Sequence, residues 1–267
     1  MGIVNVTPDS FSDGGEFFEH DAAVEHGREL AAEGAAILDI GGESTRPGAD
    51  TVSEEEELRR VVPVVERLAA AGAARISIDT TKAAVARAAL DAGATVVNDV
   101  SAFRFDPDMA GLVAERGADC CLMHMLGEPR TMQDDPRYED VVSEVKAHLE
   151  ERLAFAISEG VDEERVWLDP GIGFGKTVEH NLELLRRLDE LVAIGRPVVV
   201  GTSRKSFLGK LAQGRGEGRR IPETIATNVL ALERGATVFR VHDVAQNADA
   251  LTVAAATLRL DVGEGAR

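Results

Sequence analysis

The chain has 267 residues, of which 44% are hydrophobic and 28% charged. This length and composition suit one globular domain with a large buried core. The formal net charge of −18 argues against nucleic acids and anionic membranes as partners, because such a field repels phosphate groups. No apolar run reaches the roughly 18 residues of a membrane span, so the sequence predicts none.

The start of the chain and its cysteines indicate a compartment. The segment MGIVNVTPDS has neither the basic nor the apolar region of a secretory signal. Cys120 and Cys121 are adjacent in an apolar run, and neighbours on a strand point to opposite faces, where they cannot easily form a disulfide. Two buried thiols in a chain without a signal are typical of a reducing compartment, so we expect a cytoplasmic protein.

Eight short apolar runs predict eight strands. They cover residues 3–5, 36–40, 75–79, 95–99, 119–123, 166–169, 197–201 and 238–241. The runs are nearly continuous rather than alternating, which is typical of parallel strands buried on both faces. Each run ends in or is followed by polar side chains, namely Asn5, Asp39, Asp79, Asn98 with Asp99, His124, Asp169, Ser203, and His242 with Asp243.

Amphipathic segments separate these runs and predict helices at residues 22–33, 54–70, 82–91, 138–159, 178–188, 221–234 and 245–260. Glycines placed as helix stops precede most of the strands, at Gly34, Gly72, Gly93, Gly117, Gly160, Gly195 and Gly235. Eight such units predict an α/β fold, a single-domain (β/α)8 TIM barrel over residues 1–260, followed by a frayed tail at 261–267. A doubly wound open sheet uses the same units and is the alternative. Polar residues at nearly every strand end favour the barrel, because catalytic groups converge on that face.

Two polar, glycine-containing loops follow the first two predicted strands. The first is NVTPDSFSDGG, at residues 5–15, in which Phe11 is an apolar side chain suited to covering a ligand. An ordinary turn rich in Asp, Ser and Gly is the alternative. The second is GGESTRPG, at residues 41–48, in which small residues let the backbone approach a ligand and Arg46 could clamp a phosphate or carboxylate.

These two loops resemble the first two active-site loops of the dihydropteroate synthase family. Six shorter motifs agree in order and spacing: IDT at 78–80, ND at 98–99, MHMLGEP at 123–129, DPGIGFGK at 169–176, TSRKSF at 202–207 and RVHD at 240–243. The resemblance covers residue 1 to about residue 250. It implies an enzyme of folate biosynthesis that joins 6-hydroxymethyl-7,8-dihydropterin pyrophosphate to p-aminobenzoate, releases pyrophosphate and is a target of sulfonamides.

The resemblance also implies a pterin pocket. A pterin edge presents ring N–H and amino donors, which suit carboxylate and amide oxygens. By resemblance, Asp79, Asn98 and Asp169 hold this edge and Lys205 reaches a ring acceptor. Helix caps or buried ion pairs are the alternative roles for the two aspartates. The apolar walls of the slot would be Val100, Met123 and Phe174, although plain core packing would explain Met123 and Phe174 taken alone.

The pyrophosphate and the arylamine require further groups. Arg240 and His242 lie two residues apart at the eighth strand end, so both would face the diphosphate, with Thr45 and Arg46 approaching from the second loop. Asn5 would ligate Mg2+ through its amide oxygen. Residues 203–206 lead into the apolar pair Phe207-Leu208, which predicts the start of a short helix whose backbone N–H groups could bind an anion. The p-aminobenzoate site would comprise Phe11, Thr45, Pro47 and Ser206. We expect Lys205, Arg240, Arg46 and Asp13 to carry catalysis, and the resemblance implies a homodimer.

Two other functions on the same barrel remain as alternatives: a methyltetrahydrofolate:corrinoid methyltransferase and a non-catalytic pterin-binding paralogue. The first is expected to lack both long loops, and the second to have lost Asn5, Arg46 or Lys205, which are all present. The segment GIGFGKT imitates a phosphate-binding loop, but Pro170 occupies a position where that motif needs Gly. Cys120, Cys121 and His124 fit core packing better than zinc, and Asp39, Asp99 and His124 receive no specific role.

Overall fold

The strands occupy nearly the predicted positions. The computed structural model describes residues 1–7, 15–44, 51–212 and 220–259, and within these it leaves out the side chains of residues 15–19. The strands are β1 Gly2–Asn5, β2 Ile37–Gly41, β3 Arg75–Asp79, β4 Val96–Asp99, β5 Asp119–Met123, β6 Val166–Asp169, β7 Val199–Val200 and β8 Val238–Phe239. The last two are shorter than the apolar runs that predicted them.

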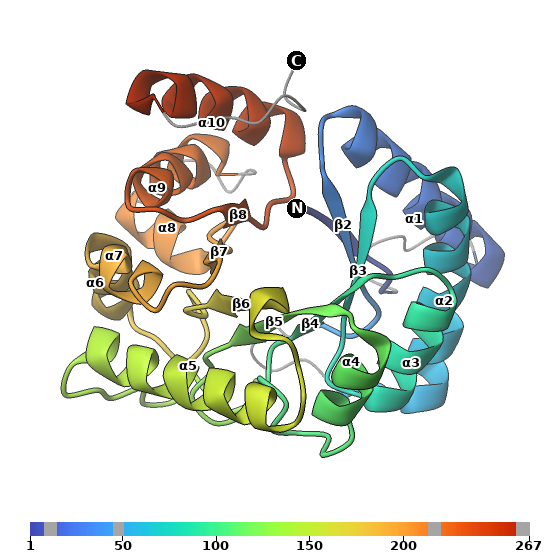
Figure 1. The fold of residues 1–267 in the computed structure, drawn as a ribbon. Helices are drawn as coiled ribbons and strands as arrows, with labels where there is room; N and C mark the ends of the chain where they lie inside the picture. Colours follow the sequence, from blue (N-terminus) through green and yellow to red (C-terminus); the bar gives the residue numbers. More distant parts are fainter. Residues whose placement is uncertain (8–14, 45–50, 213–219, 260–267) are drawn as a thin grey trace.

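The strands form a closed ring. Strands β1 to β6 pair in chain order as one parallel sheet, and β7 pairs with β8 in parallel. Two parallel bridges join these parts, one from Leu168 to Val198 and one from Gly2 to Val241. The closing hydrogen bond from Ile3 N to Val241 O is 3.0 Å long. This topology confirms the barrel rather than the open sheet, and Figure 1 shows the helices arranged around the strands.

The helices cover the outside of the barrel. They are α1 Gly15–Ala32, α2 Glu54–Ala71, α3 Ala83–Asp91, α4 Met109–Arg116, α5 Val141–Ser158, α6 Val178–Arg186, α7 Leu188–Val192, α8 Ser206–Leu211, α9 Ile221–Glu233 and α10 Val244–Leu258, with a 3-10 turn, η2, at Glu163–Arg165. All seven glycines predicted as helix stops have positive φ. At Gly72, for example, φ is 64° and the backbone N–H donates to Ala69 O.

Helices α4 and α7 have no counterpart among the predicted helices. The helix predicted at 178–188 ends at Arg186, and α7 starts two residues later. At the break, the Arg187 guanidinium pairs with Asp140 at 2.9 Å and with Glu190 at 2.7 Å. These ion pairs tie the junction to α5 and α7, an arrangement that the apolar periodicity of the segment does not encode.

The core has separate layers on the two faces of the strands. The larger layer packs helices against the barrel and includes Cys120, whereas Cys121 belongs to a small cluster with Val96, Trp167 and Val199. The two thiols therefore point to opposite faces, as predicted. Burial raises the pKa of both thiols, so they are inert packing groups.

Candidate active site

The carboxyl ends of the strands bring predicted pterin residues together. Asp79 on β3 is the register partner of Asn98 on β4, and Asp169 on β6 is the register partner of Met123 on β5. Asn98 and Asp169 are 6% and 7% exposed. Burial raises the pKa of Asp169 and raises the pKa of Asp79 to about 7. This face of the barrel therefore presents buried acceptors whose charge is held in a low-dielectric setting.

Arg240 crosses the barrel to reach these acceptors. Its Nη2 donates to Asp79 Oδ2 at 2.7 Å, and its Nε donates to Asp39 Oδ2 at 2.6 Å. Burial alone would lower the pKa of Arg240, but Asp39 and Asp79 together raise it above its ordinary value. Asp39 is fully buried and also accepts from Ser77 Oγ at 2.6 Å and Asn98 Nδ2 at 3.1 Å. One guanidinium thus links the β8 end to β2 and β3.

The loop after β6 is held in one shape by several hydrogen bonds. Gly171 N donates to Asp169 Oδ1 at 2.6 Å, and Gly173 N donates to Asn181 Oδ1 at 2.7 Å. Tyr138 Oη donates to Gly175 O at 2.8 Å. The loop requires glycine at Gly171, where φ is 65° and an added Cβ would lie 1.8 Å from His124 O. The tight turn therefore depends on a backbone without side-chain atoms.

This loop places an aromatic ring beside a lysine. Lys205 Nζ lies 4.1 Å from the centre of the Phe174 ring, a cation–π geometry. The half-buried Phe174 packs against a small apolar cluster, separate from the main core, formed by Val100, Met123, Met125 and Met132. The structure thus brings together all three residues predicted as walls of a flat apolar slot, next to the buried acceptors.

The turn after β7 presents Lys205 and Ser206. Lys205 precedes α8, and Ser206 is its exposed first residue, which confirms the predicted short helix. Arg204 adopts φ 60° and its guanidinium pairs with Asp243 at 2.8 Å. Ser203 Oγ lies 3.0 Å from His242 Nδ1. These contacts link the turn after β7 to the segment after β8, so the positions of Lys205 and His242 are fixed relative to each other.

Comparisons with known proteins agree with this geometry. Residues 1–242 match the family described as "Pterin binding enzyme". The chain belongs to this family. It is 50% identical to the dihydropteroate synthase of Mycobacterium leprae over 97% of this chain and 93% of the relative. The structure of Xanthomonas albilineans dihydropteroate synthase with 4-aminobenzoic acid is 50% identical and has a TM-score of 0.91, covering 98% of this chain and 93% of that one.

A second structure of the Xanthomonas albilineans enzyme, in complex with 7,8-dihydropteroate, is 46% identical with a TM-score of 0.87 and covers 98% of this chain and 94% of that one. The family that the loop motifs predicted and the barrel fold are therefore confirmed. The individual residue roles that the resemblance implied stay predictions, since the comparisons name proteins rather than contacts.

Several of the predicted residues cannot be placed. Phe11, Asp13, Thr45, Arg46 and Pro47 lie outside the described residues.

The residues that flank the gap at 45–50 are described. Glu43 accepts from Val52 N at 3.4 Å, and Lys82 Nζ donates to both Glu43 Oε2 and Glu57 Oε2. Glu57 is fully buried on α2. The two sides of this gap are thus tied together by a partly buried ion-pair cluster.

Three strand-end residues without a predicted role have clear partners. Asp39 accepts from Arg240 Nε. Asp99 Oδ1 and Oδ2 accept from Ser101 N at 2.7 Å and Phe103 N at 3.0 Å, so Asp99 closes a turn. His124 Nδ1 lies 2.9 Å from Lys176 Nζ.

Lys176 is the lysine of the segment that imitates a phosphate-binding loop. It is 4% exposed, its Nζ also donates to Phe174 O at 2.9 Å, and burial lowers its pKa to about 7. It is therefore a buried structural donor of the loop after β6. The sequence signal for this role was weak, because burial of a lysine is visible only in the folded chain.

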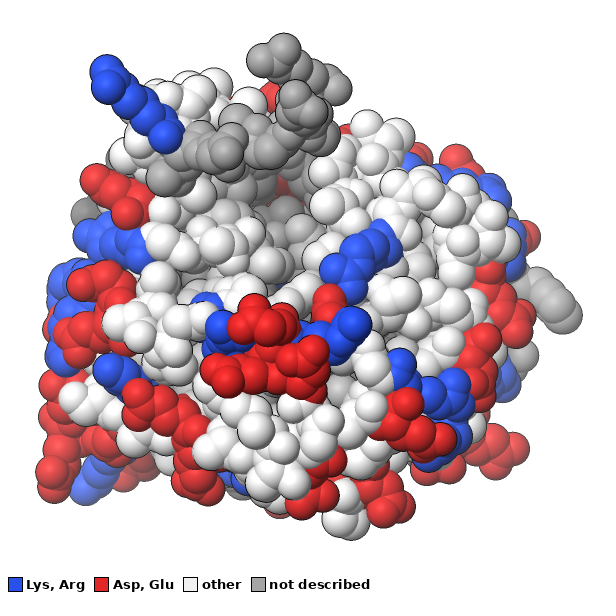
Figure 2. Space-filling view, viewed as in Figure 1, with Lys and Arg blue, Asp and Glu red and all other residues white. Residues whose placement is uncertain are grey.

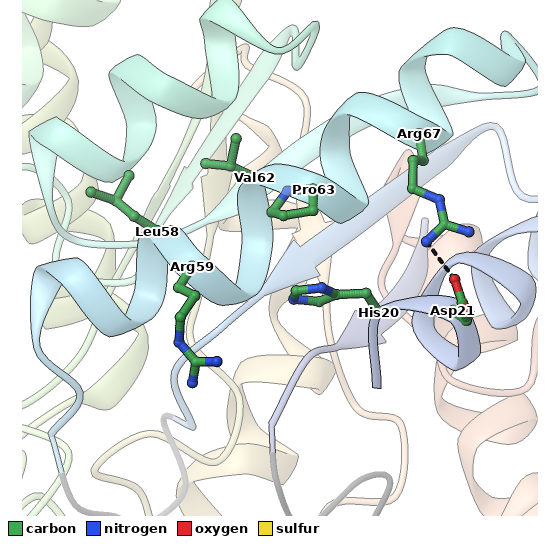
Figure 3. Close-up of a pocket in the computed structure, with 7 residues that line it drawn as sticks. All are labelled: His20, Asp21, Leu58, Arg59, Val62, Pro63 and Arg67. Atoms are coloured by element: carbon green, nitrogen blue, oxygen red, sulfur yellow. Dashed lines mark hydrogen bonds and ion pairs between the residues drawn. The ribbon is translucent and has the colours of Figure 1, made fainter. Parts of the chain in front are cut away.

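A groove on the outside of the barrel is a weaker candidate site than the strand ends. It has a volume of about 620 Å3 and lies between α1 and α2, lined by His20, Asp21, Leu58, Arg59, Val62, Pro63 and Arg67. Figure 3 shows that Arg67 already pairs with Asp21, at 2.7 Å. In Figure 2 acidic and basic side chains are interspersed around the edge of the molecule. Neither the groove nor the surface charge pattern is therefore a better candidate for the functional site than the strand ends.

Proposed function

We propose that this chain condenses 6-hydroxymethyl-7,8-dihydropterin pyrophosphate with p-aminobenzoate to give 7,8-dihydropteroate and pyrophosphate. The prediction of a dihydropteroate synthase, a transferase, is confirmed by the names of relatives that are about half identical over nearly the whole chain. The observation that carries the proposal is the meeting of buried acceptors and cations at one barrel end. Asp79, Asn98 and Asp169 supply the acceptors, and Lys205 and Arg240 supply the charge.

The pterin would bind with its donor edge toward the acceptors and its ring in the apolar slot. Ring N–H and amino donors match the oxygens of Asp79, Asn98 and Asp169. Phe174, with Val100 and Met123 behind it, offers a flat wall, and Lys205 beside that ring is placed to donate to a ring acceptor. Desolvation of the carboxylates supports this assignment, because a buried acceptor left without a donor is costly.

The diphosphate would bind at the ends of β1, β2 and β8. Arg240 and His242 supply donors from the β8 side, and Thr45 and Arg46 would supply them from the second loop. Stabilising the departing charge and excluding water are what the reaction requires, because the arylamine then attacks an electron-poor methylene carbon. Asp13, in the first loop, would be a further catalytic residue of this reaction.

Mg2+ is proposed as the cofactor, with Asn5 as its protein ligand. Asn5 ends β1 and is half-buried, and its amide oxygen is a hard donor suited to a hard ion. Among the described residues, no group of three His, Cys, Asp or Glu side chains could hold a metal ion. This donor set fits Mg2+, which commonly takes one or two protein oxygens and completes its shell with water and substrate phosphates. When bound, the ion would neutralise diphosphate charge.

The arylamine would bind over the pterin, near the start of α8. Ser206 is exposed there, next to Lys205, and could donate to the carboxylate of p-aminobenzoate. Phe11, Thr45 and Pro47 would complete this site from the two long loops.

The wider setting follows from the same proposal. The partners would be the two small-molecule substrates, with no nucleic acid or membrane among them. No helix in the described part of the chain is long and apolar enough to span a bilayer. A homodimer and a cytoplasmic location remain our predictions; the two unpaired buried thiols support a reducing compartment. Light scattering of the purified chain would test the dimer.

Pyrophosphate release tests the proposal against its rivals. With pterin pyrophosphate, Mg2+ and p-aminobenzoate, we expect release to depend on the arylamine. A pterin-binding paralogue would bind pterin without release, and a corrinoid methyltransferase would instead demethylate methyltetrahydrofolate. No release from a protein that still binds pterin would contradict the proposed reaction.

A further inference from the structure

Arg240 and Asp79 are paired with one another at the carboxyl end of the barrel. The Nη2–Oδ2 distance is 2.7 Å, and the two side chains are only 23% and 11% exposed. Arg240 Nε holds a second carboxylate, Asp39, at 2.6 Å, and this one is fully buried. Yet the proposed function gives Asp79 to the pterin and Arg240 to the diphosphate. The contact therefore joins two residues that would serve different parts of the same substrate.

The guanidinium presents to Asp79 the kind of group that a pterin would present. Both offer N–H donors carried on a planar, nitrogen-rich unit, and both suit a carboxylate acceptor. A pterin bound to Asp79 would therefore compete with Arg240 for the same carboxylate. Asp39 would not be part of this competition, because it is fully buried and already accepts from Ser77 and Asn98.

We propose that pterin binding displaces Arg240 from Asp79 and frees it for the diphosphate, while Asp39 holds Arg240 throughout as its permanent counter-ion. Asp39 is thus a positioning residue that touches neither substrate. The inference rests on the proposed function and adds to it a coupling: the pterin and diphosphate parts of the site bind cooperatively rather than independently.

The direction of this coupling follows from the charges in each state. If pyrophosphate binds alone, Arg240 leaves Asp79 without a donor in a buried setting, which is costly. If pterin binds first, its N–H groups replace Arg240 at Asp79, and the second ligand then meets a free guanidinium. Pyrophosphate should therefore bind more tightly when pterin is present, and pterin more tightly when pyrophosphate is present, by the same factor.

The same reasoning explains how product could leave. Once the pterin moiety departs as product, Asp79 is again without a donor, and Arg240 regains it by releasing pyrophosphate. An empty site would thus bind free pyrophosphate weakly, which limits inhibition by this product.

Binding of separate probes to the wild-type chain tests the coupling. The probes are inorganic pyrophosphate and 6-hydroxymethylpterin, which lacks the diphosphate, titrated by calorimetry with Mg2+ present throughout. We expect saturating pterin to raise the affinity for pyrophosphate about tenfold or more, within the usual range of coupling between sites. Affinities that agree within twofold with and without pterin, or mutually exclusive binding, would overturn the inference.

Asp39→Asn separates the positioning role from a general loss of structure. Without this carboxylate, Arg240 has no counter-ion once pterin takes Asp79, so pterin binding alone should weaken about tenfold. Saturating pyrophosphate should restore the affinity for pterin, because it supplies the missing negative charge. A defect of equal size with and without pyrophosphate would show a merely structural role and contradict the inference.

Ser77→Ala is the matched control. It removes a bond to Asp39 Oδ1 but leaves the Asp39 contact with Arg240, so both affinities should stay within about threefold of wild type. If Asp39→Asn does not fold, the wild-type titrations alone decide. The outcome is also separable from the proposed function: turnover without coupling refutes only this inference, whereas absence of pterin binding refutes the proposed site itself.

Discussion

The loop after β6 offers a sharp test of how the backbone shapes the pterin site. Gly171 and Gly72 have almost the same backbone angle, φ 65° and 64°. An added Cβ at Gly72 would meet no atom within 4 Å, whereas at Gly171 it would lie 1.8 Å from His124 O. Comparing Gly171→Ala with Gly72→Ala therefore separates the cost of the left-handed conformation from the cost of the contact.

The two substitutions should differ clearly in free energy of unfolding. The left-handed conformation costs an alanine about 1 kcal/mol, which is all that Gly72→Ala should lose. At Gly171 the carbonyl must also retreat by about 1.5 Å to reach an ordinary carbon–oxygen contact, and overpacking of this kind costs about 1–3 kcal/mol more. The shift would disturb the hydrogen bond from His124 N to Asp169 O, which is 3.0 Å long.

Urea denaturation and pterin titration together provide the assay. We expect Gly171→Ala to lose about 3 kcal/mol of stability and to weaken pterin binding, because Asp169 and Phe174 sit on the displaced loop. Gly72→Ala should bind pterin as wild type does. Equal stabilities for the two variants, with unchanged pterin affinity in Gly171→Ala, would refute this reasoning.

Three further predictions concern other parts of the site. The raised pKa of Asp79, about 7, means that the carboxylate is protonated below this pH, so pterin affinity should rise between pH 6 and 8 and become flat in Asp79→Asn. The contribution of Asp79 to stability changes with pH in the opposite direction to the pterin affinity. It is fully present below the ordinary pKa of the carboxyl group and is lost as the pH rises through about 7, which thermal denaturation of the wild type and of Asp79→Asn would detect. Lys82→Met should lower the free energy of unfolding by about 3 kcal/mol, because it leaves the buried Glu57 unpaired. Lys146→Met, at an exposed pair, should lower it by under about 1 kcal/mol. Equal losses would contradict a stabilising role of Lys82 in the ion-pair cluster. Substituting Phe11 should change inhibition by sulfonamides, and identical inhibition constants for variant and wild type would place the arylamine elsewhere.

Much of the fold was predictable because its signals are local. A glycine that ends a helix is needed for its own backbone angle, and all seven predicted stops have positive φ. A buried parallel strand is apolar throughout, so β3, β5 and β6 were predicted with their observed bounds. The short β7 and β8 were overestimated, because apolar residues continue beyond the paired segment.

The contacts of the site were less predictable because they depend on closure of the barrel. Asp39 and Arg240 are 201 residues apart in sequence and meet only when β8 returns beside β1. The strand-end pattern indicates Asp39 as a candidate site residue but does not predict its ion-pair partner. Lys176 is a second example, in which a local motif indicates the wrong partner. Its motif indicates phosphate binding, whereas in the folded chain its buried Nζ contacts His124 and Phe174.

Formation of 7,8-dihydropteroate is the measurement that tests the central claim most directly. The purified chain would be incubated with pterin pyrophosphate, Mg2+ and isotope-labelled p-aminobenzoate, and the products would be quantified by mass spectrometry. We predict labelled 7,8-dihydropteroate and pyrophosphate in equal amounts. Pyrophosphate without labelled product, or neither product from a protein that binds pterin, would contradict the account.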